Sequence, residues 1–318
     1  MRNARLISRR GFLQLAAAMA SSAALGGCTR RAPATYIPPA SRREIPPVKD
    51  ELRLIAVGDW GQSGEGLPAT IRGMDAASKT LDGFHAGMFL GDNFYPDGVK
   101  SVDDDLWRRY FEEPFDTEQL GNLSWHAILG NHDWRGNVQA QIEYSKRNKR
   151  WVMPDHYWRK DFGPSGEKPL LTVLAIDTDK HFEPWNKQLD WLEAQLIETR
   201  QASWPRVVIG HHTLVSYSNH GFTSYMVEEF EPLFSKYEIA AYLCGHDHNM
   251  QVGEKNGVTY AVLGGGGASL YDVEHGTLSS FARKSHGFGA LRVTRKQLSI
   301  ECRDTTGQVV HTQSRAVA

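Results

Sequence analysis

Five short polar motifs, each placed after an apolar run of strand length, constrain this chain more than any other feature of its sequence. They are Gly58-Asp59-Trp60-Gly61, Gly91-Asp92-Asn93-Phe94-Tyr95, Gly130-Asn131-His132-Asp133, Gly210-His211 and Gly245-His246-Asp247-His248. The apolar runs before them are typical of buried strands. Because open α/β sheets keep their ligand sites at the carboxyl ends of strands, the motifs are predicted to converge at one edge of a sheet.

The pattern between and after the motifs predicts the fold class. Strands are expected at 52–57, 86–90, 125–129, 170–176, 207–209 and 240–243, and helices at 69–80, 103–115 and 186–199. Further short strands at 258–263, 288–293 and 298–303 are expected to form a second sheet. Strands that alternate with helices, followed by strands alone, predict an α/β fold of two packed mixed β-sheets flanked by helices.

The residue types in the motifs are those of a two-metal site. Asp59, Asp92 and Tyr95 offer hard oxygen atoms and, with one imidazole, would give a metal three negative charges. That charge favours a trivalent ion such as Fe(III). Asn131 is neutral and, with two imidazoles and a share of Asp92, suits a divalent ion. The two oxygens of Asp92 can bridge ions about 3.5–4 Å apart.

Taken singly, a Gly-Asp pair after a strand more often forms a turn than a metal site. The occurrence of all five motifs in order, each after a strand, is what favours the site. Asp133 and Asp247 are expected to fix ligand imidazoles or backbone turns rather than to react. Histidines outside the motifs, such as His156, show no ligand spacing.

Composition excludes some classes and leaves others open. A formal net charge of −1 argues against a protein that holds nucleic acid through overall positive charge. No internal repeat or second boundary is visible, so one catalytic domain is predicted at 51–318. Of the three cysteines, Cys244 and Cys302 fall in that domain, either bridged or, as the pattern favours, as buried free thiols.

The first fifty residues predict export. The segment Ser8-Arg9-Arg10-Gly11-Phe12-Leu13-Gln14 precedes an apolar stretch, 15–25, that is too short to span a bilayer comfortably, and it resembles a twin-arginine signal. Leu25-Gly26-Gly27-Cys28 resembles a lipobox, whose cysteine is acylated; the alternative is an ordinary cleaved signal with an incidental cysteine. Residues 1–28 are therefore predicted as a signal and 29–50, rich in Pro and Arg, as a tether. The chain would cross the bacterial inner membrane and stay periplasmic or at the cell surface, touching the membrane only through Cys28.

The ordered motifs resemble the metallophosphoesterase pattern, and Tyr95 makes the chain similar to the purple acid phosphatases, above all the small, tartrate-resistant kind. The similarity runs from about residue 52 to near the end. It implies an αββα sandwich with Fe(III) and divalent Fe, Zn or Mn. The implied ligands are Asp59, Asp92, Tyr95 and His248 for Fe(III), and Asp92, Asn131, His211 and His246 for the divalent ion. His132 and His220 would face the substrate. His212 is the only other histidine that could take the place of His211 as a metal ligand.

The chain departs from the family pattern at two places. Trp134 follows Asp133 where a histidine is expected, which alters the mouth of the site but removes no ligand. The loop 178–185 is short where animal members carry a longer, cleavable, inhibitory one, which puts control by proteolysis in doubt.

The resemblance implies a monomeric acid phosphatase. It would hydrolyse phosphate monoesters of small molecules or phosphoproteins. A metal-bound hydroxide at a dinuclear Fe(III)–M(II) centre would attack the phosphorus atom, and His220 or His132 would protonate the leaving alkoxide. One alternative is a phosphodiesterase or nucleotide hydrolase with the same metals, which parallel rates on p-nitrophenyl phosphate and its bis ester would reveal. Another is a lipoprotein that holds phosphate or iron without hydrolysis.

Overall fold

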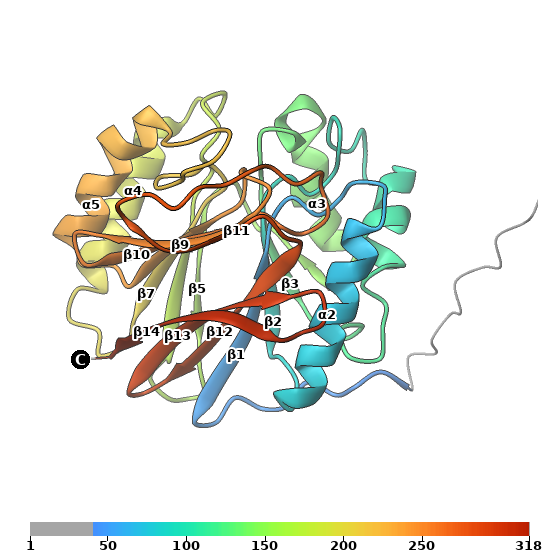
Figure 1. Ribbon diagram of the computed structural model, residues 1–318, viewed down its shortest axis with the longest axis horizontal. Helices are drawn as coiled ribbons and strands as arrows, with labels where there is room; N and C mark the ends of the chain where they lie inside the picture. Colours follow the sequence, from blue (N-terminus) through green and yellow to red (C-terminus); the bar gives the residue numbers. More distant parts are fainter. Residues whose placement is uncertain (1–40, 318) are drawn as a thin grey trace, which may run out of the picture. The chain divides into compact units, whose positions relative to one another are not determined.

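Residues 41–317 are described by the computed structural model, and the predicted export signal and lipobox lie outside them. The described part is built on two seven-stranded sheets (Figure 1). The first sheet has the order β14-β13-β12-β1-β2-β3-β4. Its strands are β1 (Glu51–Val57), β2 (Ala86–Leu90), β3 (Trp125–Ile128), β4 (Trp151–Val152), β12 (Gly287–Thr294), β13 (Gln297–Asp304) and β14 (Val309–Ala316).

The second sheet has the order β11-β9-β10-β8-β7-β6-β5. Its strands are β5 (Trp158–Phe162), β6 (Leu171–Ala175), β7 (Arg206–Ile209), β8 (Ala241–Cys244), β9 (Met250–Lys255), β10 (Val258–Leu263) and β11 (Ser279–Arg283). Strands β6, β7, β8 and β10 run parallel, whereas β5 and β9 pair antiparallel with their neighbours. The first sheet also combines both kinds of pairing, so the predicted pair of mixed sheets is confirmed.

The assignment of strands to sheets is wrong in two respects. Of the late strands expected in a second sheet, only β10 lies there, while β12 and β13 extend the first sheet beside β1. In Figure 1 the blue β1 accordingly lies next to the red β12. The motifs also end strands of both sheets, namely β1, β2 and β3 of the first and β7 and β8 of the second. A local apolar pattern indicates that a strand is buried but does not name the strand it pairs with.

Burial on both faces explains the continuous apolar runs before the motifs. In β1, Leu52, Leu54 and Ala56 belong to the core that also contains residues of the second sheet, whereas Ile55 and Val57 pack with the residues of helix α2. Successive side chains of a strand point to opposite faces. A strand covered by a sheet on one face and by a helix on the other must therefore be apolar at every position.

Helices cover the outer faces of the two sheets. They are α2 (Gly66–Thr80), α3 (Val138–Arg147), α4 (Trp185–Glu198) and α5 (Glu231–Lys236). Leu192 and Leu196 of α4 pack against Leu174 and Val208 of the second sheet. Three shorter helical turns are the π-helical η2 (Trp107–Glu112) and η4 (Met226–Phe230) and the 3₁₀ turn η3 (Asp133–Arg135). The helix expected at 103–115 thus shrinks to η2.

Cys244 and Cys302 are buried free thiols, which confirms the favoured interpretation.

The end of the predicted tether contacts the domain, since Arg42 pairs with Asp116 and the backbone N–H of Arg43 donates to the carbonyl of Glu118. Within residues 41–317 no helix is both long and apolar enough to cross a bilayer.

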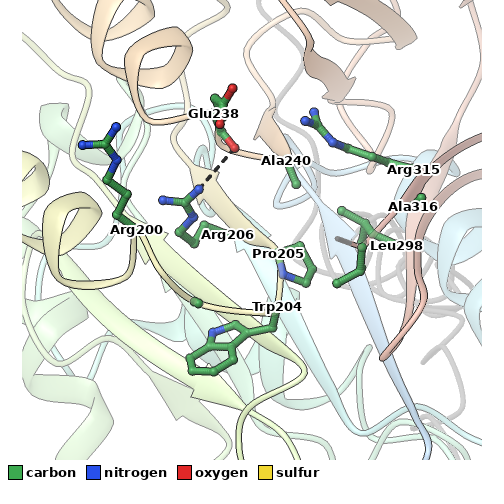
Figure 2. A pocket seen from close by; sticks show the side chains of 11 residues that line it. Arg200, Trp204, Pro205, Arg206, Glu238, Ala240, Leu298, Arg315 and Ala316 are labelled. Atoms are coloured by element: carbon green, nitrogen blue, oxygen red, sulfur yellow. Dashed lines mark hydrogen bonds between the residues drawn. The ribbon is translucent and has the colours of Figure 1, made fainter.

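A pocket of about 230 Å³ opens at the amino ends of β7 and β8 (Figure 2). Arg200, Arg206 and Arg315 line it, and Arg206 donates to the carbonyls of Tyr237 and Glu238. The motifs stand at the opposite, carboxyl ends of these strands. The arginine-lined pocket therefore contains none of the predicted site residues.

Candidate metal centre

The motif residues lie in tight turns where the strands end. Asp59, Asp92 and His246 have φ angles of 59°, 50° and 72°, a left-handed region that is costly for residues other than glycine and recurs at functional sites. A Cβ on Gly130 would lie 2.2 Å from Oδ1 of Asp92, and one on Gly245 would lie 2.3 Å from Oδ2 of Asp59. The glycines of the motifs are therefore required because the carboxylates pack directly against the backbone.

Four of the predicted ligands meet around the phenol oxygen of Tyr95. This oxygen lies 3.0 Å from Oδ1 of Asp59, 2.9 Å from Oδ2 of Asp92 and 3.0 Å from Nε2 of His248. All four side chains are buried. Nδ1 of His248 lies 2.8 Å from the carbonyl oxygen of Ser269, so Nδ1 carries the proton and the lone pair of Nε2 faces the cluster. The single phenol proton cannot satisfy three acceptors.

The same arrangement recurs on the other side of Asp92. Nδ1 of His211 lies 2.9 Å from the carbonyl oxygen of Leu90, which leaves Nε2 as an acceptor. This Nε2 lies 3.2 Å from Oδ1 of Asn131 and 3.4 Å from Oδ1 of Asp92. Acceptors that face acceptors in a buried place repel one another unless a cation lies between them. The donor set therefore fits a metal centre.

The pKa values point in the same direction. Burial alone would lower the pKa of His211, but Asp92 beside it raises the pKa to about 10, so positive charge is favoured between these two groups. Burial raises the pKa of Tyr95 well above its usual value, and the carboxylates of Asp59 and Asp92 raise it further. Ligand atoms of Asp59, Asp92 and His211 all lie within 4.8 Å of one another, as metal binding requires.

His246 and His220 lie next to this cluster. The backbone N–H of His246 donates to Oδ2 of Asp59 at 2.9 Å, and the His246 ring lies 5.1 Å from the ring of His211. The ring of His220 stacks on His246 at 4.0 Å. Both predicted residues are therefore brought to the site, although their roles stay predictions.

His132 lies on the other side of the phenol. Its backbone N–H donates to Oδ1 of Asp92 at 2.8 Å, and its ring lies 4.3 Å from the ring of Tyr95. Nδ1 of His132 lies 2.5 Å from the carbonyl oxygen of Pro96. That contact places the proton on Nδ1 and fixes the ring against the phenol of the cluster.

His212, the competitor of His211, contacts a different partner. Its Nδ1 lies 2.9 Å from Oγ1 of Thr178. Burial lowers the pKa of His212 to about 3, and the neighbouring His211 contributes to this shift. The side chain that faces Asp92 is that of His211, in agreement with the predicted ligand set.

Asp133 and Asp247 support the turns, as expected from the sequence. Asp133 accepts hydrogen bonds from the backbone N–H groups of Asn93 and Gly130 and from Nε2 of Gln141. Asp247 accepts from Oγ of Ser216 and from the backbone N–H of His220. Burial and the nearby charge of Asp92 raise the pKa of Asp133 to about 7, although its donors oppose this shift.

Sequence reasoning gave no role to a further buried carboxylate, that of Asp177. Asp177 is fully buried and accepts from Nε1 of Trp134 at 3.1 Å, while Nδ1 of His156 lies 2.8 Å from Oδ2 of Asp177. The one available signal was that Asp177 follows a buried strand, as Asp59 does. Tyr271 was also missed, and its ring stacks on that of His248 at 4.2 Å.

Comparison with known proteins identifies the family. Residues 52–250 match the model of the calcineurin-like phosphoesterase family. The chain belongs to this family. All five motifs with which the candidate metal centre is built lie within the matched residues.

Several named relatives of this chain are acid phosphatases. Tartrate-resistant acid phosphatase type 5 of Oryctolagus cuniculus is 32% identical over 289 residues, which cover 81% of this chain and 88% of that protein. Purple acid phosphatase 7 of Arabidopsis thaliana is 28% identical over 288 residues, covering 83% and 85%. This calcineurin-like phosphoesterase therefore groups with the acid phosphatases, and that relationship implies a dinuclear metal centre.

A solved structure supports the calcineurin-like phosphoesterase fold. The structure titled "GAP50 the anchor in the inner membrane complex of Plasmodium" has a TM-score of 0.76 at 24% sequence identity. The match covers 85% of this chain and 90% of that chain. At this identity the likeness concerns the fold alone.

Proposed function

We propose that this chain is an acid phosphatase that hydrolyses phosphate monoesters at a centre of Fe(III) and divalent Fe, Zn or Mn. The observation that carries the proposal is the pair of buried acceptor clusters joined by Asp92, one around Tyr95 and one at His211. A carboxylate with one oxygen in each cluster suits a bridge between two ions. The similarity to tartrate-resistant and purple acid phosphatases supports the reaction class.

The proposed ligands divide between the two ions according to charge. Asp59, Tyr95 and His248 would hold Fe(III), Asn131, His211 and His246 would hold the divalent ion, and Asp92 would contribute to both. Burial and two carboxylates hold the pKa of Tyr95 well above its usual value. A phenolate at this position therefore needs a strongly charged cation, which favours a trivalent ion on that side.

The protein's own groups would bind and orient the substrate. When bound, the two ions supply Lewis-acid activation of water and of the phosphoryl group. In this proposal His132 and His220 would contact phosphoryl oxygens and give a proton to the leaving alkoxide. The contact of His132 with Pro96 and the stacking of His220 on His246 support these roles. A histidine must be charged to give that proton, so activity is expected at acid pH.

The Tyr95→Phe substitution tests the Fe(III) assignment. A phenolate bound to Fe(III) gives a visible charge-transfer band, so the purified protein should be purple and the variant colourless. Visible absorption and metal analysis of both proteins are the measurements. Tyr271→Phe is the matched control, because the Tyr271 ring packs against His248 and His220, which phenylalanine preserves, and it should keep the band. A colourless wild-type protein that holds two zinc or manganese ions would contradict the Fe(III) assignment.

We also propose that the protein is an exported, lipid-anchored monomer of the periplasm or cell surface, which acts on phosphorylated small molecules or phosphoproteins and not on nucleic acid. The motifs at Arg9-Arg10 and at Cys28 support export and anchoring. Radiolabelled palmitate should label the wild type and not Cys28→Ala. Equal labelling of the two proteins would contradict the anchor.

A further inference from the structure

A cleft of about 600 Å³ is lined in part by aromatic residues. Some of its lining residues follow directly on the Gly130–Asp133 motif, and others follow the loop after Asp177. Its aromatic lining residues are Trp134, His156, Tyr157 and Phe182, and we call this space the aromatic cleft. The ring of His156 stacks on that of Phe182 at 4.7 Å. The rings of Trp134 and Tyr157 lie 6.4 Å and 6.0 Å from the same phenyl ring. These four rings therefore form an aromatic part of the lining.

Two short connections join the aromatic cleft to the metal centre. Trp134 belongs to the same turn as His132, and its backbone N–H donates to the carbonyl of Gly130 at 3.2 Å. On the other wall, Thr178 directly follows Asp177, and Oγ1 of Thr178 accepts from the backbone N–H of His211 at 3.2 Å. One wall of the cleft thus follows the turn that carries Asn131, and the other follows a residue that is bonded to the backbone of His211.

Two polar atoms of the aromatic side chains already have partners. Nε1 of Trp134 donates to Asp177, and Nδ1 of His156 lies 2.8 Å from the same carboxylate. Asp177 is itself fixed, because its backbone N–H and carbonyl both bond to the side chain of Gln188 at 2.8 Å. What Trp134 and His156 offer to a ligand is therefore chiefly ring surface held in a fixed arrangement.

Ionisable side chains of both kinds line the opening. Lys187 and His181 stand among the lining residues together with Asp155 and Glu183. His181 is moreover paired with Asp179 at 2.6 Å. This mixture favours neither an anion nor a cation, so the cleft suits an uncharged group.

We propose that the aromatic cleft binds the leaving-group end of the substrate, so that the enzyme prefers phosphate monoesters of aromatic or bulky apolar alcohols. The inference rests on the proposed phosphatase function and specifies its substrate class. The phosphoryl group would lie at the metal centre and the alcohol portion against Trp134 and Phe182. Burial of a ring between these side chains would supply binding energy that a small alcohol cannot.

The test compares two esters with alkoxides of similar basicity, 2-phenylethyl phosphate and ethyl phosphate. Because the chemical step is matched, the ratio of their kcat/KM values reports binding of the phenyl group. The ratio should be about 30 for the wild type, the effect of burying one phenyl ring. Phe182→Ala should lower it about tenfold. Trp134→His, which keeps a ring N–H and is the milder change, should lower it about threefold.

A matched apolar truncation outside the cleft serves as control. Ile197 is 56% exposed, and Ile197→Ala should leave the ratio unchanged. A wild-type ratio near one, or an unchanged ratio in both cleft variants, would overturn the proposal.

Binding measurements separate this proposal from the phosphatase function. Calorimetric titration of the metal-loaded protein with 2-phenylethylphosphonate and with ethylphosphonate requires no turnover. Tighter binding of the phenyl compound, lost in Phe182→Ala and Trp134→His, supports the cleft even if both esters resist hydrolysis, a result that would refute only the phosphatase. Equal affinities for the two phosphonates would refute the cleft proposal alone.

Discussion

Asp92→Asn is expected to lower kcat by about a thousandfold or more and to release at least one metal ion per chain. Asp92 is buried, with one oxygen 2.9 Å from the phenol of Tyr95 and the other 3.4 Å from Nε2 of His211. Burial raises the pKa of Asp92, but His211 and then His132 more than offset this, so the net shift is downward. An amide has no charge to bind two cations, and loss of such stabilisation costs roughly 4 kcal/mol of activation free energy.

Asparagine isolates the effect of charge from that of shape. It matches aspartate in size and tolerates the φ of 50° found at this position. The measurements are kcat on p-nitrophenyl phosphate and metal content per chain. Asp97→Asn is the matched control, since Asp97 lies in the same loop but is exposed, and it should keep both metals and activity. Full activity of Asp92→Asn would refute the bridge.

Asp133→Leu is expected to lower the free energy of unfolding by about 3–5 kcal/mol. The carboxylate joins two loops, because it accepts from the backbone N–H groups of Asn93 and Gly130 and from Gln141. Asp133 is fully buried, so leucine would leave these donors without partners or water. The expected loss of stability therefore comes from hydrogen-bond donors left without acceptors, and not from a change in side-chain volume.

Urea unfolding of the metal-loaded proteins measures this effect. Asp272→Leu is the control, because the Asp272 side chain is 93% exposed and pairs only with Lys284. A surface pair of this kind contributes little, so a change of less than about 1 kcal/mol is expected there. A similarly small loss for Asp133→Leu would show that Asp133 does not hold the two loops.

The sequence predicted the site better than it predicted the arrangement of the sheets. The motifs are local signals, since Asp59 and Asp92 directly follow apolar runs that become β1 and β2. The joint occurrence of the motifs predicted that the ligands lie in one region, and the structure brings them together there. Which sheet each strand joins depends on pairing between distant segments, and no local pattern of β12 points to β1.

The features that the sequence did not predict depend on contacts across the fold. Asp177, Trp134 and His156 come from three separate segments and meet only once both sheets have packed. None of these residues has a spacing that indicates a site. Helix α3 was missed because few of its positions are apolar, and strand β4 was missed because it is only two residues long.

The position of β12 has a consequence for synthesis of the chain on the ribosome. β1 pairs with β2 soon after it is made, but its other edge has no partner until Gly287–Thr294 has been translated. Every proposed ligand lies before that point, so a nascent chain ending at residue 286 would contain the whole metal-binding set and an open strand edge. Open edges invite pairing with other chains. Strands β12 and β13 thus cover the edge of the buried strand β1, and the finished sheet ends instead at β14, a strand of exposed and half-buried residues.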